Sequence, residues 1–344
     1  MTKYIVFGGK CAVSIDYDSK NRAVACLFDE YRHHLLDSGY SLPIVGVIRV
    51  FDNVRKPSSA VLLHDGRMYV DGKVLYCADG PSYVRISLSE VTFSLDIDSM
   101  TGFGLLMTVL QPLLNWYLPK YGLAFLHTAS FKYRDEVYAI SGLGGTGKTE
   151  VMLEALQRGA QYLSDDLCLF DKDGNICPYL RKISLHDYPF NDEQLDRFNL
   201  NKRQYHLMMY CKDKPGRITQ YLYQRYRGRF KISFDYTAVS SVKVEYADKS
   251  FPVKVHYWLD ATDKTEFKVL SAEDFIRKMT FCMQNEFRPY CDFDGCFGIV
   301  YDFWQKKRNE HNRLLAEILN KIEITGLSIR TGAYNELAEL ILNY

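Results

Sequence analysis

Residues 142–149 have the composition and spacing of a phosphate-binding loop. Their sequence, Gly-Leu-Gly-Gly-Thr-Gly-Lys-Thr, fits the pattern GxxxxGK[ST]. In this pattern the glycines turn backbone N–H groups towards phosphate oxygens, the lysine neutralises the outer phosphates, and the hydroxyl binds Mg²⁺. We therefore predict a nucleoside triphosphate site. The residues expected to bind it are Gly142, Gly144, Gly145, Thr146, Gly147, Lys148 and Thr149.

The segments beside the loop support this prediction. Residues 136–141 are typical of a short apolar strand, and residues 151–158 of a helix that ends at Gly159. Strand, loop and helix in this order aim a helix N-terminus at an anion. Strand residues resume at 162–164 and lead into Asp165 and Asp166. Both carboxylates are thus expected at the carboxyl end of a strand, where an α/β sheet keeps its ligands.

Asp165 and Asp166 are candidates for metal binding and proton transfer. One should reach Mg²⁺, and the other should accept the proton of an attacking hydroxyl. The alternative is an Asp-Asp turn with no chemical role. Adjacent side chains of an extended strand point to opposite faces, so a local bend is required if both are to face the phosphates.

Composition and charge narrow the class of protein. The chain has 344 residues, enough for about two domains, and a net charge of +1, which gives no global attraction to nucleic acid or membranes. Its nine cysteines show no zinc-ligand spacing. The N-terminus lacks the pattern of a secretory signal, and the apolar stretch 105–118 is shorter than a membrane span. We expect a cytoplasmic protein with reduced thiols and no nucleic-acid or membrane partner.

Hydrophobic patterning predicts two parts. Residues 1–100 should form a β-rich α+β domain, with one helix around 27–38, and residues 101–344 should form an α/β domain with a mixed sheet. The apolar stretch 105–118 should be a buried helix. Further expected elements are a hairpin of residues 167–170 and 176–177, a strand at 253–259, and helices at 272–286, 309–322 and 334–342.

Four features outside the loop pattern have matching positions in a known family. They are His127 upstream of the loop, Glu150 directly after it, Gly159 at the end of the helix, and the Asp165-Asp166 pair. With the loop, they resemble the HPr kinase/phosphorylase family and, more distantly, phosphoenolpyruvate carboxykinase. Residues 122–170 carry the resemblance. The nearest layout is that of HPr-kinase-like proteins with a small β-rich N-terminal domain, some of which look like kinases of free serine or of ribosomal peptides.

The resemblance implies a carboxykinase-like P-loop fold and further roles. Asp166 would be the catalytic base, and Asp165 would bind Mg²⁺ with Thr149 and Glu150. His127 would contact the phosphates or the acidic pair, or ligate a metal, whereas its other interpretation is a core histidine. For Glu150 the other interpretation is a favourable charge in the first turn of a helix. The Arg-Gly-x-Gly segment that follows a Glu in HPr kinases is missing after Asp166.

A basic, tyrosine-rich stretch follows the nucleotide-binding region. It includes Lys212, Lys214, Arg217, Arg225, Arg227, Arg229 and Lys231. A solvated basic face is the default interpretation. The functional alternative is a segment with residues 214–217 at its tip, in which Arg217 would supply positive charge to the transition state.

Together these features predict an ATP- and Mg²⁺-dependent kinase that phosphorylates a hydroxyl, with GTP or pyrophosphate as alternative donors. The acceptor would be a seryl side chain of a peptide or protein, or a small molecule such as free serine. One alternative is a nucleotide-binding switch or sensor that docks a partner through its N-terminal domain. Another is a carboxykinase-like lyase. The resemblance leaves a homo-oligomer open.

Overall fold

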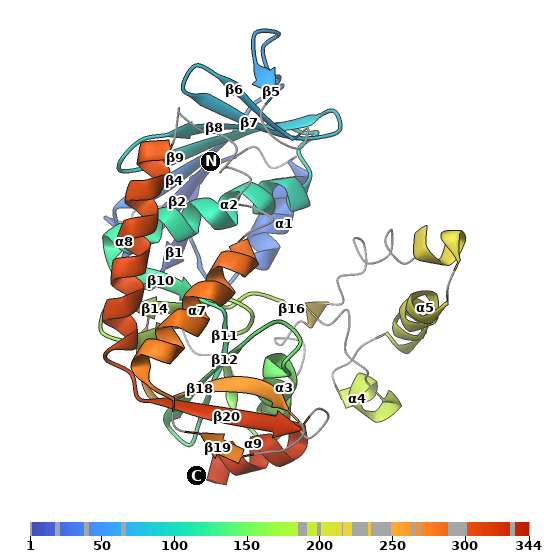
Figure 1. The fold of residues 1–344 in the computed structure, drawn as a ribbon. Helices are drawn as coiled ribbons and strands as arrows, with labels where there is room; N and C mark the ends of the chain where they lie inside the picture. The colour runs from blue at the N-terminus through green and yellow to red at the C-terminus, as the bar shows by residue number, and fades with distance from the viewer. Residues whose placement is uncertain are drawn as a thin grey trace.

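The fold is that of a computed structural model, and it is a mixed α/β structure with two large mixed sheets (Figure 1). No helix in the part of the chain described is long and apolar enough to cross a membrane. The described residues are 2–17, 21–37, 41–62, 67–184, 191–197, 201–214, 216–221, 233–234, 249–262, 266–268, 270–287, 301–330 and 334–343.

The first sheet is formed by the N-terminal part of the chain. Its strand order is β3-β1-β2-β4-β9-β8-β7-β6-β5. Strand β4 runs parallel to its neighbours β2 and β9, and the remaining pairs are antiparallel. The strands are β1 (Thr2–Phe7), β2 (Cys11–Asp16), β3 (Leu35–Leu36), β4 (Ile44–Val50), β5 (Val61–Leu62), β6 (Met68–Asp71), β7 (Val74–Asp79), β8 (Ser82–Leu88) and β9 (Phe93–Ile97).

The second sheet carries the loop predicted to bind phosphate. Its main order is β10-β14-β15-β18-β12-β11-β13, and β20 also pairs with β18. Strand β18 runs parallel to both β12 and β20, so the carboxyl ends of these strands share one edge. The strands are β10 (Leu123–Leu126), β11 (Thr128–Tyr133), β12 (Glu136–Gly142), β13 (Gln161–Ser164), β14 (Cys168–Asp171), β15 (Asn175–Cys177), β18 (Phe251–Thr262), β19 (Glu266–Lys268) and β20 (Ile324–Arg330), with β16 (Ile183–Ser184) and β17 (Ser233–Phe234) as a separate pair.

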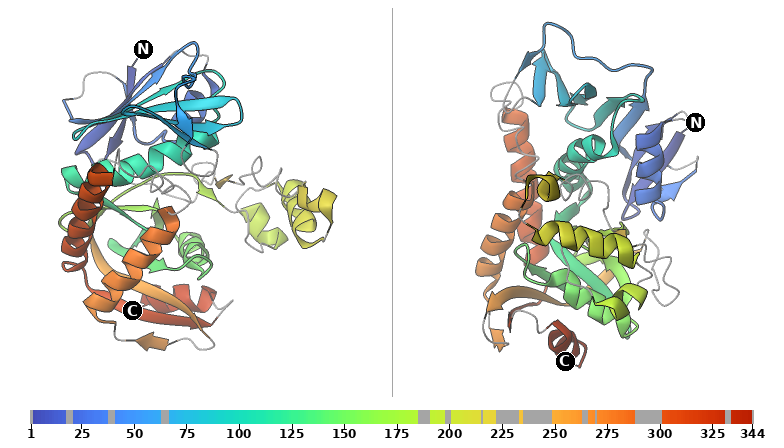
Figure 2. Two further views of the ribbon diagram at one scale, coloured as in Figure 1. Left: turned by 45° about the horizontal axis from the view of Figure 1, so that its top comes forward. Right: turned by 90° about the vertical axis from the view of Figure 1, so that its right-hand side faces the viewer.

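Helices connect and cover the two sheets. Helix α2 lies between them, α8 runs alongside both, and α3 and α9 pack together on the second sheet (Figures 1 and 2). The helices are α1 (Arg22–Glu30), α2 (Phe103–Tyr117), the short 3₁₀ helix η1 (Leu118–Tyr121), α3 (Lys148–Gln157), α4 (Asp192–Arg197), α5 (Lys202–Asp213), α7 (Ala272–Phe287), α8 (Tyr301–Leu319) and α9 (Tyr334–Asn343).

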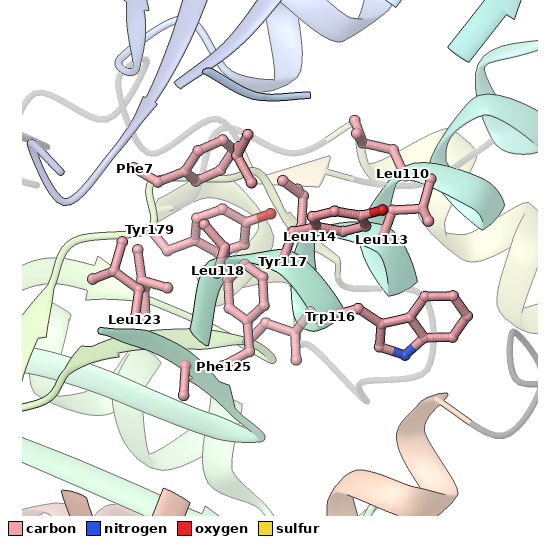
Figure 3. Packing of buried hydrophobic residues seen from close by; sticks show 14 of the residues in the cluster. Phe7, Leu110, Leu113, Leu114, Trp116, Tyr117, Leu118, Leu123, Phe125 and Tyr179 are labelled. Carbon is pink, nitrogen blue, oxygen red and sulfur yellow. The ribbon is translucent and has the colours of Figure 1, made fainter. Parts of the chain in front are cut away.

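One apolar core joins the two halves of the chain. Figure 3 shows Phe7 of the first sheet beside Tyr179, with Phe125 of β10 close by, and the ring centroids of Phe125 and Tyr179 are 4.9 Å apart. Helix α2 contributes apolar side chains from all round its surface, as a helix buried on every side must. The predicted division at residue 100 therefore falls between β9 and α2, while the core continues across it.

Most of the predicted elements agree with the structure, including the strand-loop-helix unit and the hairpin of β14 and β15. The predicted helix at 27–38 was wrong. Helix α1 begins earlier because the Asn21 side chain accepts a hydrogen bond from the Val24 N–H (3.1 Å). Residues 35–36 instead pair with β1. The predicted helix at 309–322 was also misplaced, since α8 starts at Tyr301 and ends at Leu319. Strand β20, which follows it, was not predicted.

Candidate active site

The loop predicted to bind phosphate connects β12 to α3, the order expected from the sequence. Gly145 and Gly147 have φ values of 77° and 96°, a region that side chains with a Cβ rarely adopt. Gly147 is the N-cap of α3 and offers no side-chain acceptor. The first turn of α3 therefore directs N–H groups and its positive dipole end at the loop, which suits an anion.

Gly142 is required because the loop packs closely against β18 at this position. A Cβ atom at this position would lie 2.6 Å from Thr146 Oγ1 and 2.7 Å from the backbone oxygen of Leu259 on β18. Any other residue would push the loop away from the neighbouring strand. Gly144, by contrast, faces open space.

The Lys148 side chain turns back onto the loop that contains it. Its side chain is buried, and Nζ donates hydrogen bonds to the carbonyls of Gly142 and Leu143, both at 3.1 Å. These carbonyls hold the ammonium group at the place where the loop pattern expects phosphates. Phosphate oxygens would compete for the same N–H donors, and their negative charge makes them the stronger acceptors.

Asp165 lies against the end of the loop. Thr149 Oγ1 donates a hydrogen bond of 2.9 Å to Asp165 Oδ1. Burial, together with the neighbouring charge of Asp166, raises the pKa of Asp165 to about 7. A hydroxyl and a carboxylate oxygen placed together are ligands of the kind that Mg²⁺ prefers.

Asp166 adopts the local bend that the sequence argument required. Its φ is 67°, in the left-handed region, and the N–H of Leu167 bonds back to the carbonyl of Asp165 at 2.8 Å. Asp tolerates this region better than most residues. Because of the bend, Asp165 can bond with Thr149 while Asp166 turns to a different partner.

That partner is His127, which lies between β10 and β11. Its Nε2 is 3.2 Å from Asp166 Oδ1, and its Nδ1 is 2.9 Å from Cys282 Sγ. Burial alone would lower the pKa of His127, but the hydrogen bonds with Asp166 and Cys282 outweigh burial and raise it to about 9. Loss of water raises the pKa of Asp166 little because its side chain is 63% exposed, and the hydrogen bond with His127 and the charge of its ring leave that pKa below its ordinary value. At neutral pH the two residues thus form an imidazolium–carboxylate pair.

Helix α7 connects this pair to the loop, a link that sequence reasoning missed. Cys282 Sγ is 3.5 Å from the carbonyl of Gly142 and donates to it, and Met283 Sδ accepts the backbone N–H of His127 at 3.1 Å. With His127 protonated, Nε2 donates to Asp166 and Nδ1 donates to Cys282, so a continuous chain of hydrogen bonds links Asp166 to the first residue of the loop. No local motif marks Cys282, because its role depends on α7 reaching the sheet.

A second polar row lies beneath the loop. Thr128 Oγ1 and Ser141 Oγ are 2.6 Å apart, and Ser141 Oγ is 2.7 Å from Nε2 of His256. Burial lowers the pKa of His256 to about 3. His256 is therefore neutral at physiological pH, and the row supports the strand ends without adding charge.

Arg181 is a source of positive charge near Asp166, whereas the sequence had suggested Arg217 as the source of such charge. Its charge is among the influences that lower the pKa of Asp166, and its Nε donates to Glu30 Oε1 of the N-terminal part at 2.8 Å. Nearby, the hydroxyls of Tyr31 and Tyr179 are 2.7 Å apart and fully buried. The segment leading from β15 to β16 is thus bonded to the N-terminal half, and Arg181 acts on Asp166 through its charge.

Two predicted residues make no side-chain hydrogen bond or ion pair with this cluster among the contacts that the structure describes. Arg217 is exposed, and the preceding helices α4 and α5 extend to one side of the molecule (Figure 1). Glu150 is in the first turn of α3, and burial raises its pKa. Within the described residues no three His, Cys, Asp or Glu side chains gather to hold a metal ion. Pro215 and residues 222–232 of the basic stretch lie outside the described residues.

The cluster therefore combines an anion cradle, a pair of hard oxygen ligands and an imidazolium–carboxylate pair. No family model matches the chain, and no curated protein matches it either. The chemistry of the cluster is consequently the basis for inferring a function.

Proposed function

We propose that this protein is an ATP- and Mg²⁺-dependent kinase with a carboxykinase-like P-loop fold, and that it transfers the γ-phosphate to a hydroxyl. The acceptor is a seryl side chain of a peptide or protein, or a small molecule such as free serine. The observation that carries the proposal is the pairing of Asp166 with His127 beside the loop. A protein that only binds nucleotide has no need of a carboxylate held there by a buried imidazolium.

The loop would hold the triphosphate. The N–H groups of Gly144, Gly145 and Gly147 and of the first turn of α3 would bind its oxygens, and Lys148 would exchange its carbonyl partners for outer phosphate oxygens. Thr149 Oγ1 and Asp165 Oδ1, 2.9 Å apart, fit Mg²⁺, which commonly takes few protein ligands and completes its shell with phosphates and water. When bound, Mg²⁺ would neutralise phosphate charge.

Asp166 would orient the acceptor hydroxyl and take its proton. The hydroxyl oxygen bonds to the γ-phosphorus, the bond from phosphorus to the leaving ADP oxygen breaks, and the hydroxyl proton passes to the carboxylate. A low pKa is compatible with this role, because phosphoryl transfer has a loose transition state in which the proton leaves late. His127, as an imidazolium, adds positive charge near the transferred group.

A nucleotide-dependent switch is the second candidate, and one observation favours it. Arg181, whose charge acts on Asp166, bonds to Glu30 of the N-terminal half, and Tyr179 bonds to Tyr31. A change of conformation at the loop on nucleotide binding could therefore alter the N-terminal half, where a partner would dock. In the kinase proposal the same connection would serve recognition of the acceptor.

Transfer of labelled γ-phosphate distinguishes the two candidates. Wild-type protein with Mg²⁺ and labelled ATP is mixed with peptide and small-molecule fractions of the native cell extract, and Lys148→Ala is the matched control. A kinase puts label into an organic acceptor, and the variant does not. If ATP binds but the label appears only in inorganic phosphate or stays on ATP, the switch is the better description.

A further inference from the structure

A basic cleft lies at the far end of the strands that carry the candidate active site. It has a volume of about 810 Å³, within the usual range for small-molecule sites. Its walls come from η1, α8 and the turns between β1 and β2, between β8 and β9, and between β14 and β15. The charged residues lining it are Lys10, Lys120, Lys172, Lys306, Lys307 and Arg313, against Glu90, Glu310 and Glu317.

The charges of this cleft do not cancel. Six cationic and three acidic side chains leave an excess of three positive charges in the lining. Each acid already has a partner: Glu90 pairs with Lys306 (3.2 Å), Glu310 with Lys307 (3.2 Å) and Glu317 with Lys321 (3.4 Å). Lys10 pairs with Asp171 behind the wall at 3.6 Å.

Three cations therefore remain for a ligand. Lys120, Lys172 and Arg313 are exposed, and none of the ion pairs found in the described ranges involves them. Lys307 also lines the cleft, and its side chain is held in place. It is only 3% exposed, and its ammonium lies 4.9 Å from the ring centroid of Tyr117. Lys307 is already paired with Glu310, so the cations left for a ligand are the three exposed ones, and together they suit an anion with several charged groups.

We infer that this cleft is a second anion site, which binds a small molecule carrying two or more phosphate groups. Phosphate groups match the excess charge better than single carboxylates, since each carries nearly two negative charges and several acceptor oxygens. The inference goes beyond the proposed kinase activity, and it does not depend on it.

The cleft lies at one end of the paired strands β10 and β14, and the candidate active site lies at the other end. Strands β10 and β14 pair along their length, and the Lys172 N–H bonds to the Gly122 carbonyl at the cleft end (2.8 Å). At the other end the Thr128 N–H bonds to the Asp166 carbonyl (3.2 Å). The two sites are thus one four-residue strand apart, about 13 Å.

Calorimetric titration with inorganic tripolyphosphate tests the inference. The measurement is made without Mg²⁺ in a Lys148→Ala background, so that the phosphate-binding loop does not hold the probe. Adding Lys172→Glu and Arg313→Glu should weaken binding at least tenfold. Adding Arg22→Glu and Lys73→Glu instead makes the same change in net charge at two exposed positions elsewhere and should leave affinity within twofold.

A milder variant covers the case in which charge reversal disturbs folding. Lys120→Gln, at an exposed position, should weaken tripolyphosphate binding about threefold while the thermal midpoint stays unchanged. Equal affinity in the cleft variants and in the surface control would overturn the inference. So would the loss of all binding on Lys148→Ala alone, because the probe would then have occupied only the loop.

Discussion

His127 Nε2 and Asp166 Oδ1 lie 3.2 Å apart because two strands bring them together. His127 follows β10 and Asp166 precedes β14, and these strands pair from Leu123↔Asp171 to Leu126↔Cys168. The register of the sheet therefore fixes the distance between the imidazole and the carboxylate. The pair is in place before any ligand arrives, which is the preorganisation that electrostatic catalysis requires.

The first prediction concerns the protonation of His127. Its imidazole should titrate at about 9, well above the ordinary 6.5, because Asp166 and Cys282 favour the charged form more than burial disfavours it. In Asp166→Asn the carboxylate is gone while burial remains, so the pKa of His127 should fall towards or below 6.5. NMR titration of ¹⁵N-labelled histidine measures both values. A wild-type pKa near 6.5 that Asp166→Asn leaves unchanged would contradict this description of the pair.

Cys282 should act as a positioning residue. Cys282→Ala removes the partner of His127 Nδ1 and the donor to the Gly142 carbonyl, and an unsatisfied buried polar group costs about 1–3 kcal/mol. We expect the rate of phosphoryl transfer to fall about tenfold, with little change in the KM for ATP, and the pKa of His127 to decrease.

Cys282→Ser is the control, since a hydroxyl can donate and accept at the same place. It should keep most of the activity and a raised pKa of His127. If alanine and serine variants behave alike, Cys282 contributes only packing.

The close approach of the loop to β18 predicts different outcomes at two glycines. Gly142→Ala places a methyl group 2.6 Å from Thr146 Oγ1 and 2.7 Å from the Leu259 carbonyl. The resulting shift should weaken binding of an ATP analogue at least tenfold and cost about 1–3 kcal/mol of stability. Gly144→Ala meets no atom within 4 Å and should change either quantity little. Fluorescence titration and thermal unfolding compare them, and equal effects would mean that the loop is not held in this way.

Stability should depend on pH through a buried histidine at the junction of the two halves. His34 Nδ1 donates to the Val6 carbonyl (3.0 Å), and Nε2 accepts the Leu180 N–H (2.9 Å), which requires the neutral ring. Burial lowers its pKa from 6.5 to about 4. Below pH 6.5 the unfolded chain binds the proton more readily, so this stabilisation is present at higher pH and is lost as the pH falls from 6.5 towards 4.

His34→Gln keeps one donor and one acceptor but does not titrate. Between pH 8 and pH 5.5 the wild type should lose about 1 kcal/mol more free energy of unfolding than the variant does. Urea unfolding at the two pH values gives the comparison. Equal losses in both proteins would show that His34 is not held neutral in the folded state.

Local signals in the sequence were sufficient for the loop and its neighbours. The spacing of Gly142, Lys148 and Thr149 and the apolar runs beside them predict the strand, loop and helix that the structure contains. The Asp165-Asp166 position at the end of β13 was also readable, although its bend depends on a left-handed φ at Asp166. These features involve residues close together in the chain.

Contacts between distant segments were not readable. Cys282 reaches His127 only because α7 packs against the sheet. The charge of Arg181 acts on Asp166 where the chain passes α1, with Arg181 bonded to Glu30 of that helix. No residue spacing encodes either contact. The boundaries of α1 were misjudged because capping by Asn21 determined its start and an apolar pattern did not.

The rate of phosphoryl transfer by Asp166→Asn, measured together with its affinity for ATP, is the decisive comparison. Asp173→Asn is the control, because Asp173 is an exposed turn residue that the proposal gives no role. We predict that Asp166→Asn binds ATP within threefold of wild type and transfers labelled γ-phosphate to the acceptor at least a hundredfold more slowly, while Asp173→Asn matches wild type. Transfer by Asp166→Asn at the wild-type rate, or no transfer by the wild type to any acceptor pool, would contradict the proposed kinase mechanism.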